Sequence, residues 1–247
     1  MSVFLNLNQT IKQKGSAYAV LIDPDRKNIN LFDQNVRVGN DSNVDAFFVG
    51  GSLMMDSESN NRVANIKEVS EIPLILFPGG VGQLSQHYDA MLFMSVISGR
   101  NSHYLIGEQV IAAPIVKDLG IETIATGYIL LDGGACSTVE FMSGTRPIPI
   151  NRTDIIIAHA LAGQYLGMEV IYLESGSGAQ SPVTKDVVTA VKEAINIPII
   201  VGGGIKSPET ASELVKAGAS IIVTGTITEK DSSLMSEIAD AVHWREK

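Results

Sequence analysis

Residues 72–80 read Ile-Pro-Leu-Ile-Leu-Phe-Pro-Gly-Gly, and residues 197–204 read Ile-Pro-Ile-Ile-Val-Gly-Gly-Gly. Both are apolar runs that end in glycine, and they start 125 residues apart (197 against 72) in a chain of 247 residues. Val49-Gly50 matches Leu173-Glu174 at nearly the same spacing, 124 residues. A displacement of half the chain indicates two halves that contain the same elements in the same order.

Eight apolar runs of this kind occur along the chain, and each ends in small, glycine-rich or acidic residues. They are rich in Ile, Val, Leu and Phe and too short for free-standing helices, as expected of strands buried on both faces. Eight strands in 247 residues give about 31 residues per unit, the size of a strand–helix repeat. The runs are Ala17–Ile22, Ala46–Val49, Pro73–Phe77, Ala90–Met94, Thr123–Leu131, Met168–Leu173, Pro198–Val201 and Ala219–Val223.

Helix signals lie between these strands. Residues 153–166 and 184–194 have helical patterns, and Ser207-Pro208-Glu209 supplies a cap, a first-turn proline and an acid at the positive helix end. Together with the half-chain repeat, this alternation favours a single (β/α)8 barrel over residues 1–247 rather than an open doubly wound sheet. Residues 132–150 contain Gly, Ser and Pro and are predicted to form an elaborated loop.

The overall charge argues against a nucleic-acid partner. The chain has 27 Asp and Glu against 18 Lys and Arg, a net charge of −9, whereas nucleic-acid grooves carry a surplus of basic residues. Cys136 is the single cysteine and cannot form an internal disulfide. Because no secretory signal is visible and no apolar run approaches the roughly 18 residues of a membrane-spanning helix, we expect a soluble cytoplasmic protein.

Three strand ends are suited to binding an anion. Active sites of such barrels lie at the carboxyl ends of the strands, often with a phosphate near the last two. Here residues 175–178, 202–204 and 224–226 are rich in Gly, Ser and Thr and follow the sixth, seventh and eighth strands. Glycine lets backbone N–H groups approach a phosphate, and the following helices add positive dipole ends. The pattern predicts a phosphorylated small-molecule ligand.

Two acidic residues stand at strand ends, Asp23 after the first strand and Glu174 at the end of the sixth. Asp23 follows the first strand and Ser52 follows the second, an arrangement that suits Mg²⁺ with a few oxygen ligands and substrate phosphates. The alternative for residues 23–25 is a turn and helix cap. Glu174 closes the sixth strand and enters the phosphate loop, where it could take a proton from a substrate hydroxyl. The alternative for Glu174 is a salt bridge at the barrel rim.

The segment Tyr172-Leu173-Glu174-Ser175-Gly176-Ser177-Gly178-Ala179 resembles the YLE-x-GSGA signature of the geranylgeranylglyceryl phosphate synthase family. Members of that family are barrel prenyltransferases that join a polyprenyl diphosphate to sn-glycerol 1-phosphate. Other blocks resemble the family's in the same order, so the resemblance covers nearly the whole chain. They are Leu21–Asp25, Val49–Ser52, Phe77–Gly79, Tyr104–Gly107, Ala112–Pro114, Gly202–Ile205 and Thr224–Thr226.

The resemblance implies a role for each of these blocks. Asp23 and Ser52 would hold Mg²⁺ against the diphosphate, and Tyr172 and Glu174 would be the catalytic residues. An apolar groove along the second to fourth strands would take the prenyl tail, and the product would be 3-O-geranylgeranyl-sn-glycerol 1-phosphate, an ether-lipid precursor. The implied glycerol 1-phosphate ligands are Tyr172, Leu173, Glu174, Ser175, Gly176, Ser177, Gly178, Gly203, Gly204, Gly225 and Thr226.

The resemblance also implies a homo-oligomer, either a dimer or a hexamer, and a lipid product makes transient contact with a membrane surface a further expectation. Without the resemblance, two other readings fit the residues. One is a barrel isomerase or aldolase of sugar phosphates, although none of the eight runs ends in the lysine that a Schiff-base aldolase needs. The other is a non-enzymatic barrel that binds flavin or phosphate.

Overall fold

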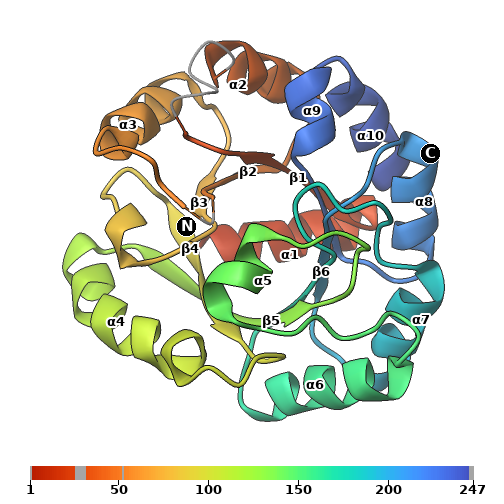
Figure 1. The fold of residues 1–247 in the computed structure, drawn as a ribbon. Coiled ribbons are helices and arrows are strands. Elements are labelled where there is room, and N and C mark those ends of the chain that lie inside the picture. The colour runs from red at the N-terminus through yellow and green to blue at the C-terminus, as the bar shows by residue number, and fades with distance from the viewer. Residues whose placement is uncertain (1, 26–31, 52, 245–247) are drawn as a thin grey trace.

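Eight parallel strands form a closed barrel in chain order (Figure 1). The computed structural model describes residues 2–25, 32–51 and 53–244. The predicted runs agree with the strands to within two residues at each end, and the (β/α)8 fold is confirmed. The strands are β1 (Ala17–Ile22), β2 (Ala46–Val49), β3 (Leu74–Leu76), β4 (Ala90–Val96), β5 (Glu122–Leu130), β6 (Val170–Glu174), β7 (Ile199–Gly202) and β8 (Ile221–Thr224).

Alternate residues of each strand belong to two separate apolar layers, as the period of two requires. Small and aromatic side chains such as Ala46, Phe48 and Tyr172 fill the inside of the barrel. Branched side chains such as Val20 and Ile171 face outward and pack against the surrounding helices. Both layers are buried, so the strands read as continuous apolar runs in the sequence.

Helices surround the barrel (Figure 1). The predicted cap is confirmed, because Ser207 accepts a hydrogen bond from Thr210 N and Pro208 is the first residue of its helix. The helices outside the barrel are α2 (Phe32–Asp41), α3 (Ser59–Val69), α4 (Glu108–Leu119), α6 (Thr153–Tyr165), α7 (Lys185–Ala194), α8 (Pro208–Lys216), α9 (Thr226–Lys230) and α10 (Leu234–Val242).

Two features depart from a regular barrel. Strand β3 is followed only by a three-residue 3₁₀ turn, η2 (Val81–Gln83), in the place where a full helix is expected, and a π-helical turn, η3 (His103–Gly107), precedes α4. The predicted loop 132–150 contains a short helix, α5 (Thr138–Ser143), which the sequence analysis did not foresee. Within the described residues, no helix has the length and apolar character needed to span a membrane.

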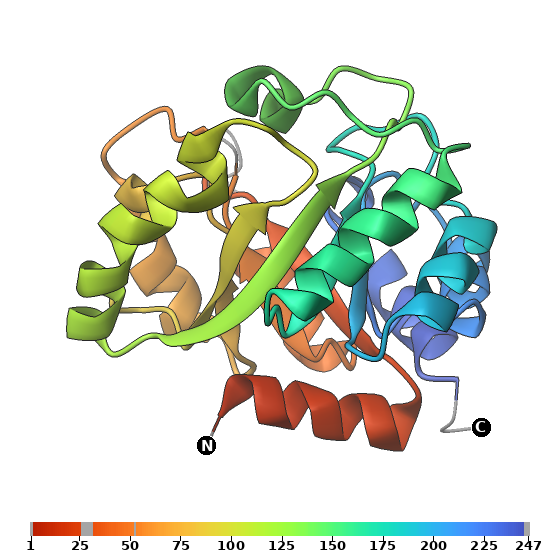
Figure 2. The same cartoon turned by 90° about the horizontal axis from the view of Figure 1, so that it is seen from below.

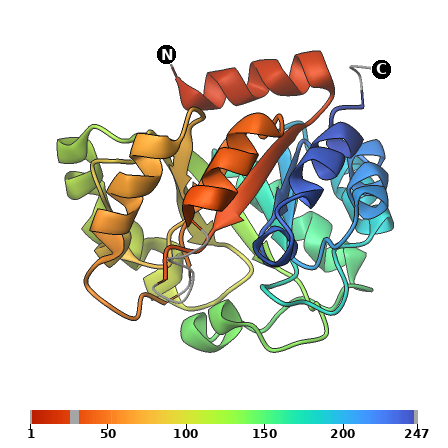
Figure 3. The same cartoon turned by 90° about the horizontal axis from the view of Figure 1, so that it is seen from above.

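An amino-terminal helix, α1 (Val3–Lys14), lies across the end of the barrel opposite to α5, as Figures 2 and 3 show. Its Val3 and Leu7 side chains pack into the apolar layer inside the barrel. Glu122, the first residue of β5, accepts hydrogen bonds from Val3 N at 2.6 Å and from Phe4 N at 3.0 Å. Helix α1 therefore covers one end of the barrel, and the active site is expected at the other end, where α5 lies.

Candidate active site

Glu174 is the last residue of β6 and points into the α5 end of the barrel with only 7% of its surface exposed. Its Oε1 atom accepts a hydrogen bond from Gly176 N at 2.6 Å, and the Tyr172 hydroxyl donates to the same carboxylate. Burial raises the pKa of Glu174 from 4.5 to about 7, although these two hydrogen bonds lower it. A carboxylate with a pKa near neutrality is suited to accept and return a proton.

Three aromatic rings form the floor beneath this carboxylate. The ring centre of Tyr172 lies 5.3 Å from that of Phe77 and 5.5 Å from that of Tyr128. Burial, followed by the charge of Glu174, raises the pKa of both tyrosine hydroxyls, so both remain protonated. Tyr128 was not predicted from the sequence; in the structure it pairs with Tyr172 in the β5–β6 register.

The loop after β7 lies directly against Glu174. Gly203 has φ of +83°, and a Cβ atom at this position would overlap Glu174 Oε1 and approach Gly176 N to 2.8 Å. Glycine is therefore required both for the backbone conformation and for the close approach. Lys206 Nζ joins the same two loops by donating to the Gln180 carbonyl at 3.1 Å. The predicted loops after β6 and β7 are thus brought together around one carboxylate.

The other predicted phosphate ligands differ in what they present to the mouth. Ser177, Gly178 and Thr226 are exposed at the rim, and Gly204 and Gly225 are half-buried. The Leu173 side chain packs in the layer between barrel and helices, so only its backbone faces the site. Ser175 is buried, and its hydroxyl oxygen has no hydrogen-bond partner within the part of the chain that the structure describes. The loop after β8 lies beside β1, since a Cβ on Gly225 would stand 3.3 Å from Leu21.

Asp23 follows β1 and lies close to the loop after β2. Its Oδ1 atom is 2.9 Å from the position that a Cβ atom on Gly51 would take, and it accepts a hydrogen bond from Asp25 N at 3.2 Å. Ser52, the other predicted metal ligand, lies outside the described residues. Among the residues that are described, no three His, Cys, Asp or Glu side chains form a metal site. One carboxylate beside a backbone loop fits Mg²⁺, which takes few protein ligands alongside water and substrate phosphates.

An apolar groove runs along β4, between η2 and α4, and residues 78–80 of the loop after β3 line one side of it. It lies where the helix after β3 is missing, on the side predicted for a prenyl tail. The Gln109 amide nitrogen donates to the Met94 carbonyl and, at 3.3 Å, to the Tyr104 carbonyl, which joins α4 to the wall of the groove. Its apolar lining includes Pro78, Val81, Leu84, Met91, Phe93, Met94, Val96, Tyr104 and Ala112.

Comparison with known proteins gives a consistent result. Residues 8–242 match the PcrB family. The chain is 46% identical over 233 residues to a geranylgeranylglyceryl phosphate synthase of Chitinophaga pinensis, covering 94% of this chain and 92% of that one. It is 46% identical over 223 residues to the enzyme of the same name from Pyrococcus horikoshii, covering 90% and 87%.

A solved structure shares the fold over almost its full length. It is the (S)-3-O-geranylgeranylglyceryl phosphate synthase from Thermoplasma acidophilum in complex with its substrate sn-glycerol-1-phosphate. The TM-score is 0.90 at 33% sequence identity, and the match covers 98% of this chain and 99% of that chain. The resemblance noted in the sequence is therefore supported by family, by relatives and by fold.

Proposed function

The chain belongs to the PcrB family, and we propose that it joins sn-glycerol 1-phosphate to a polyprenyl diphosphate, with geranylgeranyl diphosphate as the expected donor. The glycerol 3-hydroxyl oxygen forms an ether bond to the first prenyl carbon, whose bond to the diphosphate breaks. The hydroxyl proton leaves, diphosphate is released, and 3-O-geranylgeranyl-sn-glycerol 1-phosphate enters ether-lipid synthesis. The observation that carries this proposal is the buried Glu174 carboxylate, with a pKa of about 7, beside the glycine loops after β6 and β7.

Glu174 is the proton acceptor in this reaction. A phosphate held by the backbone N–H groups of the loops after β6 and β7 leaves the glycerol hydroxyls within reach of the carboxylate. Tyr172 donates to Glu174 from below and fixes its orientation. Because the aromatic floor of Phe77, Tyr128 and Tyr172 is closely packed, the substrate lies above it at the mouth.

Mg²⁺ is proposed as the cofactor, with Asp23 and Ser52 as the residues that would hold it. When bound, it would neutralise the charge of the departing diphosphate. Support comes from the position of Asp23 at the end of β1, next to the loop after β2. The loops after β1 to β3 thus form the diphosphate side of the mouth, opposite the glycerol phosphate loops.

The groove between η2 and α4 is the proposed site of the prenyl tail. Its lining includes Pro78 and is mainly apolar, with Glu108 and Gln109 as polar members. Burying a tail there removes apolar surface of both partners from water, at roughly 25 cal/mol per Å². Support for this proposal comes from the position of the groove along β4 and the loop after β3, within the region of the second to fourth strands that was expected from the sequence.

A direct assay tests the proposed reaction. The protein is incubated with Mg²⁺, radiolabelled sn-glycerol 1-phosphate and prenyl diphosphates of several lengths, and the products are extracted into organic solvent. We expect label in the lipid phase and an equal amount of released diphosphate. If no donor length gives a labelled lipid, the proposal is wrong, and the sugar-phosphate or flavin alternatives must be tested instead.

A homo-oligomer is proposed from one face of α4. Ile106, Val110, Ile111 and Ile115 are large apolar residues that are 42–65% exposed on η3 and α4. Such a stripe is typical of an interface, and a two-fold dimer would pair it with its own copy. Light scattering after gel filtration should give twice the chain mass, and Val110→Asp with Ile115→Asp should give the monomer. A monomeric parent protein would contradict the proposal.

Contact with a membrane surface is proposed for the mouth. Leu53 and Met55, in the loop after β2, and Phe141, on α5, are exposed apolar side chains, with Phe141 at 81%. Both segments lie at the barrel end opposite to α1 (Figures 2 and 3). Sedimentation with phospholipid vesicles should retain the parent protein more than Phe141→Ser with Leu53→Ser. Equal sedimentation would contradict the proposal. A cytoplasmic location stays a prediction from the sequence.

A further inference from the structure

The loops after β1, β2 and β3 begin side by side, because Ile22 pairs with Val49 and Val49 pairs with Leu76 in the barrel register. Gly50 has φ of +155°, and a Cβ atom at this position would overlap the carbonyl oxygen of Phe77. The second loop can therefore approach the third only because residue 50 is glycine. Beyond these strand ends the loops need other contacts to hold their relative positions.

Arg62 of α3 joins the first loop to the second. Its Nε atom donates to the Pro24 carbonyl at 2.6 Å, and its Nη2 atom donates to Asp56 Oδ1, also at 2.6 Å. The Arg62 side chain is only 8% exposed. Burying a guanidinium carries a large desolvation penalty, so its pair with the partly exposed Asp56 is weak evidence for a contribution to stability.

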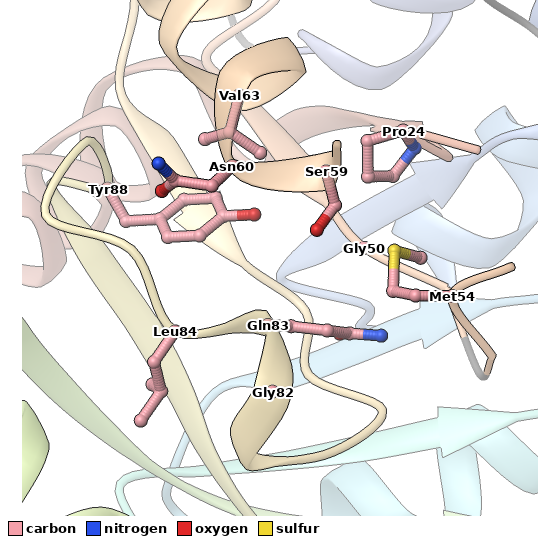
Figure 4. A pocket seen from close by; sticks show the side chains of 10 residues that line it. All are labelled: Pro24, Gly50, Met54, Ser59, Asn60, Val63, Gly82, Gln83, Leu84 and Tyr88. Carbon is pink, nitrogen blue, oxygen red and sulfur yellow. The ribbon is translucent and has the colours of Figure 1, made fainter. Parts of the chain in front are cut away.

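Gln83 of η2 joins the second loop to the third. Its amide nitrogen donates to the Gly51 carbonyl at 2.6 Å, and its amide oxygen accepts from Gly79 N at 2.8 Å. Figure 4 shows the Gln83 side chain extending toward the segment that carries Gly50 and Met54, across a pocket that Pro24 also lines. An amide supplies a donor and an acceptor together, which an ionised carboxylate cannot do.

The two contacts hold backbone carbonyls of residues that adjoin Asp23, the proposed metal ligand. Arg62 holds the carbonyl of Pro24, the residue after Asp23, and Gln83 holds the carbonyl of Gly51, which lies against Asp23 Oδ1. Residues that orient a metal ligand typically change metal affinity by 10- to 100-fold when they are replaced. A displacement of about 1 Å in such a site is enough to impair a reaction strongly.

We propose that Arg62 and Gln83 are positioning residues for the metal and diphosphate half of the site, acting through Asp23 and the loop after β2. The inference rests on the proposed function, since it assigns these loops to the prenyl diphosphate. It predicts a selective defect. Replacing either residue weakens the binding of metal and prenyl diphosphate and leaves the binding of glycerol 1-phosphate, at the loops after β6 and β7, unchanged.

The test uses Arg62→Lys, which keeps the charge but not the two-pronged geometry, and Gln83→Glu, which keeps the acceptor but not the donor. Gln83 is half-buried at the surface, so its variant is the safer of the two for folding. The first readout is Mn²⁺ affinity in the presence of inorganic diphosphate, measured by calorimetry without turnover. The second is KM for each substrate. Arg152→Ala, which removes an exposed 2.8 Å pair with Asp154, is the matched control.

We expect at least a tenfold loss of Mn²⁺ affinity and a matching rise in KM for the prenyl diphosphate in both variants, with parent values in the control. Mn²⁺ affinity within twofold of the parent would overturn the proposal. So would equal rises in both KM values together with a lower unfolding midpoint, because that pattern indicates a structural role. A parent protein without prenyl transfer would overturn the proposed function itself, before any variant is compared.

Discussion

Glu174→Gln tests two effects of this residue separately. One is its role as a proton acceptor, and the other is the loss of stability that its buried charge causes. Burial holds the pKa of Glu174 at about 7, so the ionised carboxylate is an unfavourable group inside the barrel. Glutamine keeps the shape and an oxygen that can accept from Gly176 N, but it carries no charge and no basic oxygen. The variant should therefore be nearly inactive and, above neutral pH, more stable than the parent.

The size of the stability effect follows from the pKa. Each tenfold change in an equilibrium is worth about 1.4 kcal/mol, so a pKa raised from 4.5 to about 7 corresponds to about 3 kcal/mol. The folded state favours the protonated form of Glu174. The contribution of protonated Glu174 to the free energy of unfolding is fully present below pH 4.5, declines as the pH rises to 7, and is absent above that. The advantage of the variant should grow over this window and then stay constant.

Urea unfolding of both proteins from pH 4.5 to 8.5 measures this difference. Glu193→Gln, an exposed position on α7, controls for the substitution itself and should show no such trend. In the transfer assay, kcat of Glu174→Gln should fall by about 10²- to 10⁴-fold, the usual contribution of general-base catalysis, while glycerol 1-phosphate still binds. A stability difference that does not change with pH, or near-normal turnover, would refute the reasoning.

Three further predictions concern other parts of the molecule. Asp23→Asn should raise the Mg²⁺ concentration needed for half-maximal activity by about tenfold or more; an unchanged metal titration would remove Asp23 from the metal site. Gly203→Ala should raise KM for glycerol 1-phosphate at least about tenfold, whereas Gly120→Ala, at φ of +69° with nothing within 4 Å, should leave it unchanged; equal effects would point to backbone strain alone. Burial alone would raise the pKa of Glu122, but hydrogen bonds from Ser2, Phe4 and Val3 lower it, so its contribution is present above pH 4.5 and lost in acid. Glu122→Gln should lower the unfolding midpoint by about 2–4 °C at pH 7 and by progressively less as the pH falls below 4.5; a loss that stays undiminished in acid would disprove the role of the carboxylate.

The parts of the site that could be predicted are those determined by short stretches of sequence. Glycine strings at the ends of apolar runs located the loops after β6, β7 and β8, and Glu174 was correctly expected to close its strand. The repeat of 125 residues indicated a barrel because equivalent strands in the two halves end in similar glycine-rich residues. The glycine strings are local signals, because the tight turns and close approaches at strand ends require glycine at those positions.

The parts that could not be predicted depend on partners far apart in the chain. The docking of α1 rests on Glu122, which is 119 residues away from Val3. Tyr128 reaches the site only through the register of two strands, and Arg62 meets Pro24, 38 residues earlier in the chain, only once α3 has packed on the barrel. No spacing rule in one sequence records such contacts, because they are set by tertiary packing.

The short turn η2 would give the prenyl tail a structural role in addition to its role as substrate. Because η2 stands where a full helix would follow β3, part of the outer apolar layer beside it is only partly covered, at half-buried side chains such as Phe93. A prenyl tail in that groove would occupy the place of the absent helix and complete the hydrophobic shell. The donor would then act as a removable structural element. Its binding should raise the melting temperature with its concentration and carry a negative heat-capacity change, as a folding step does.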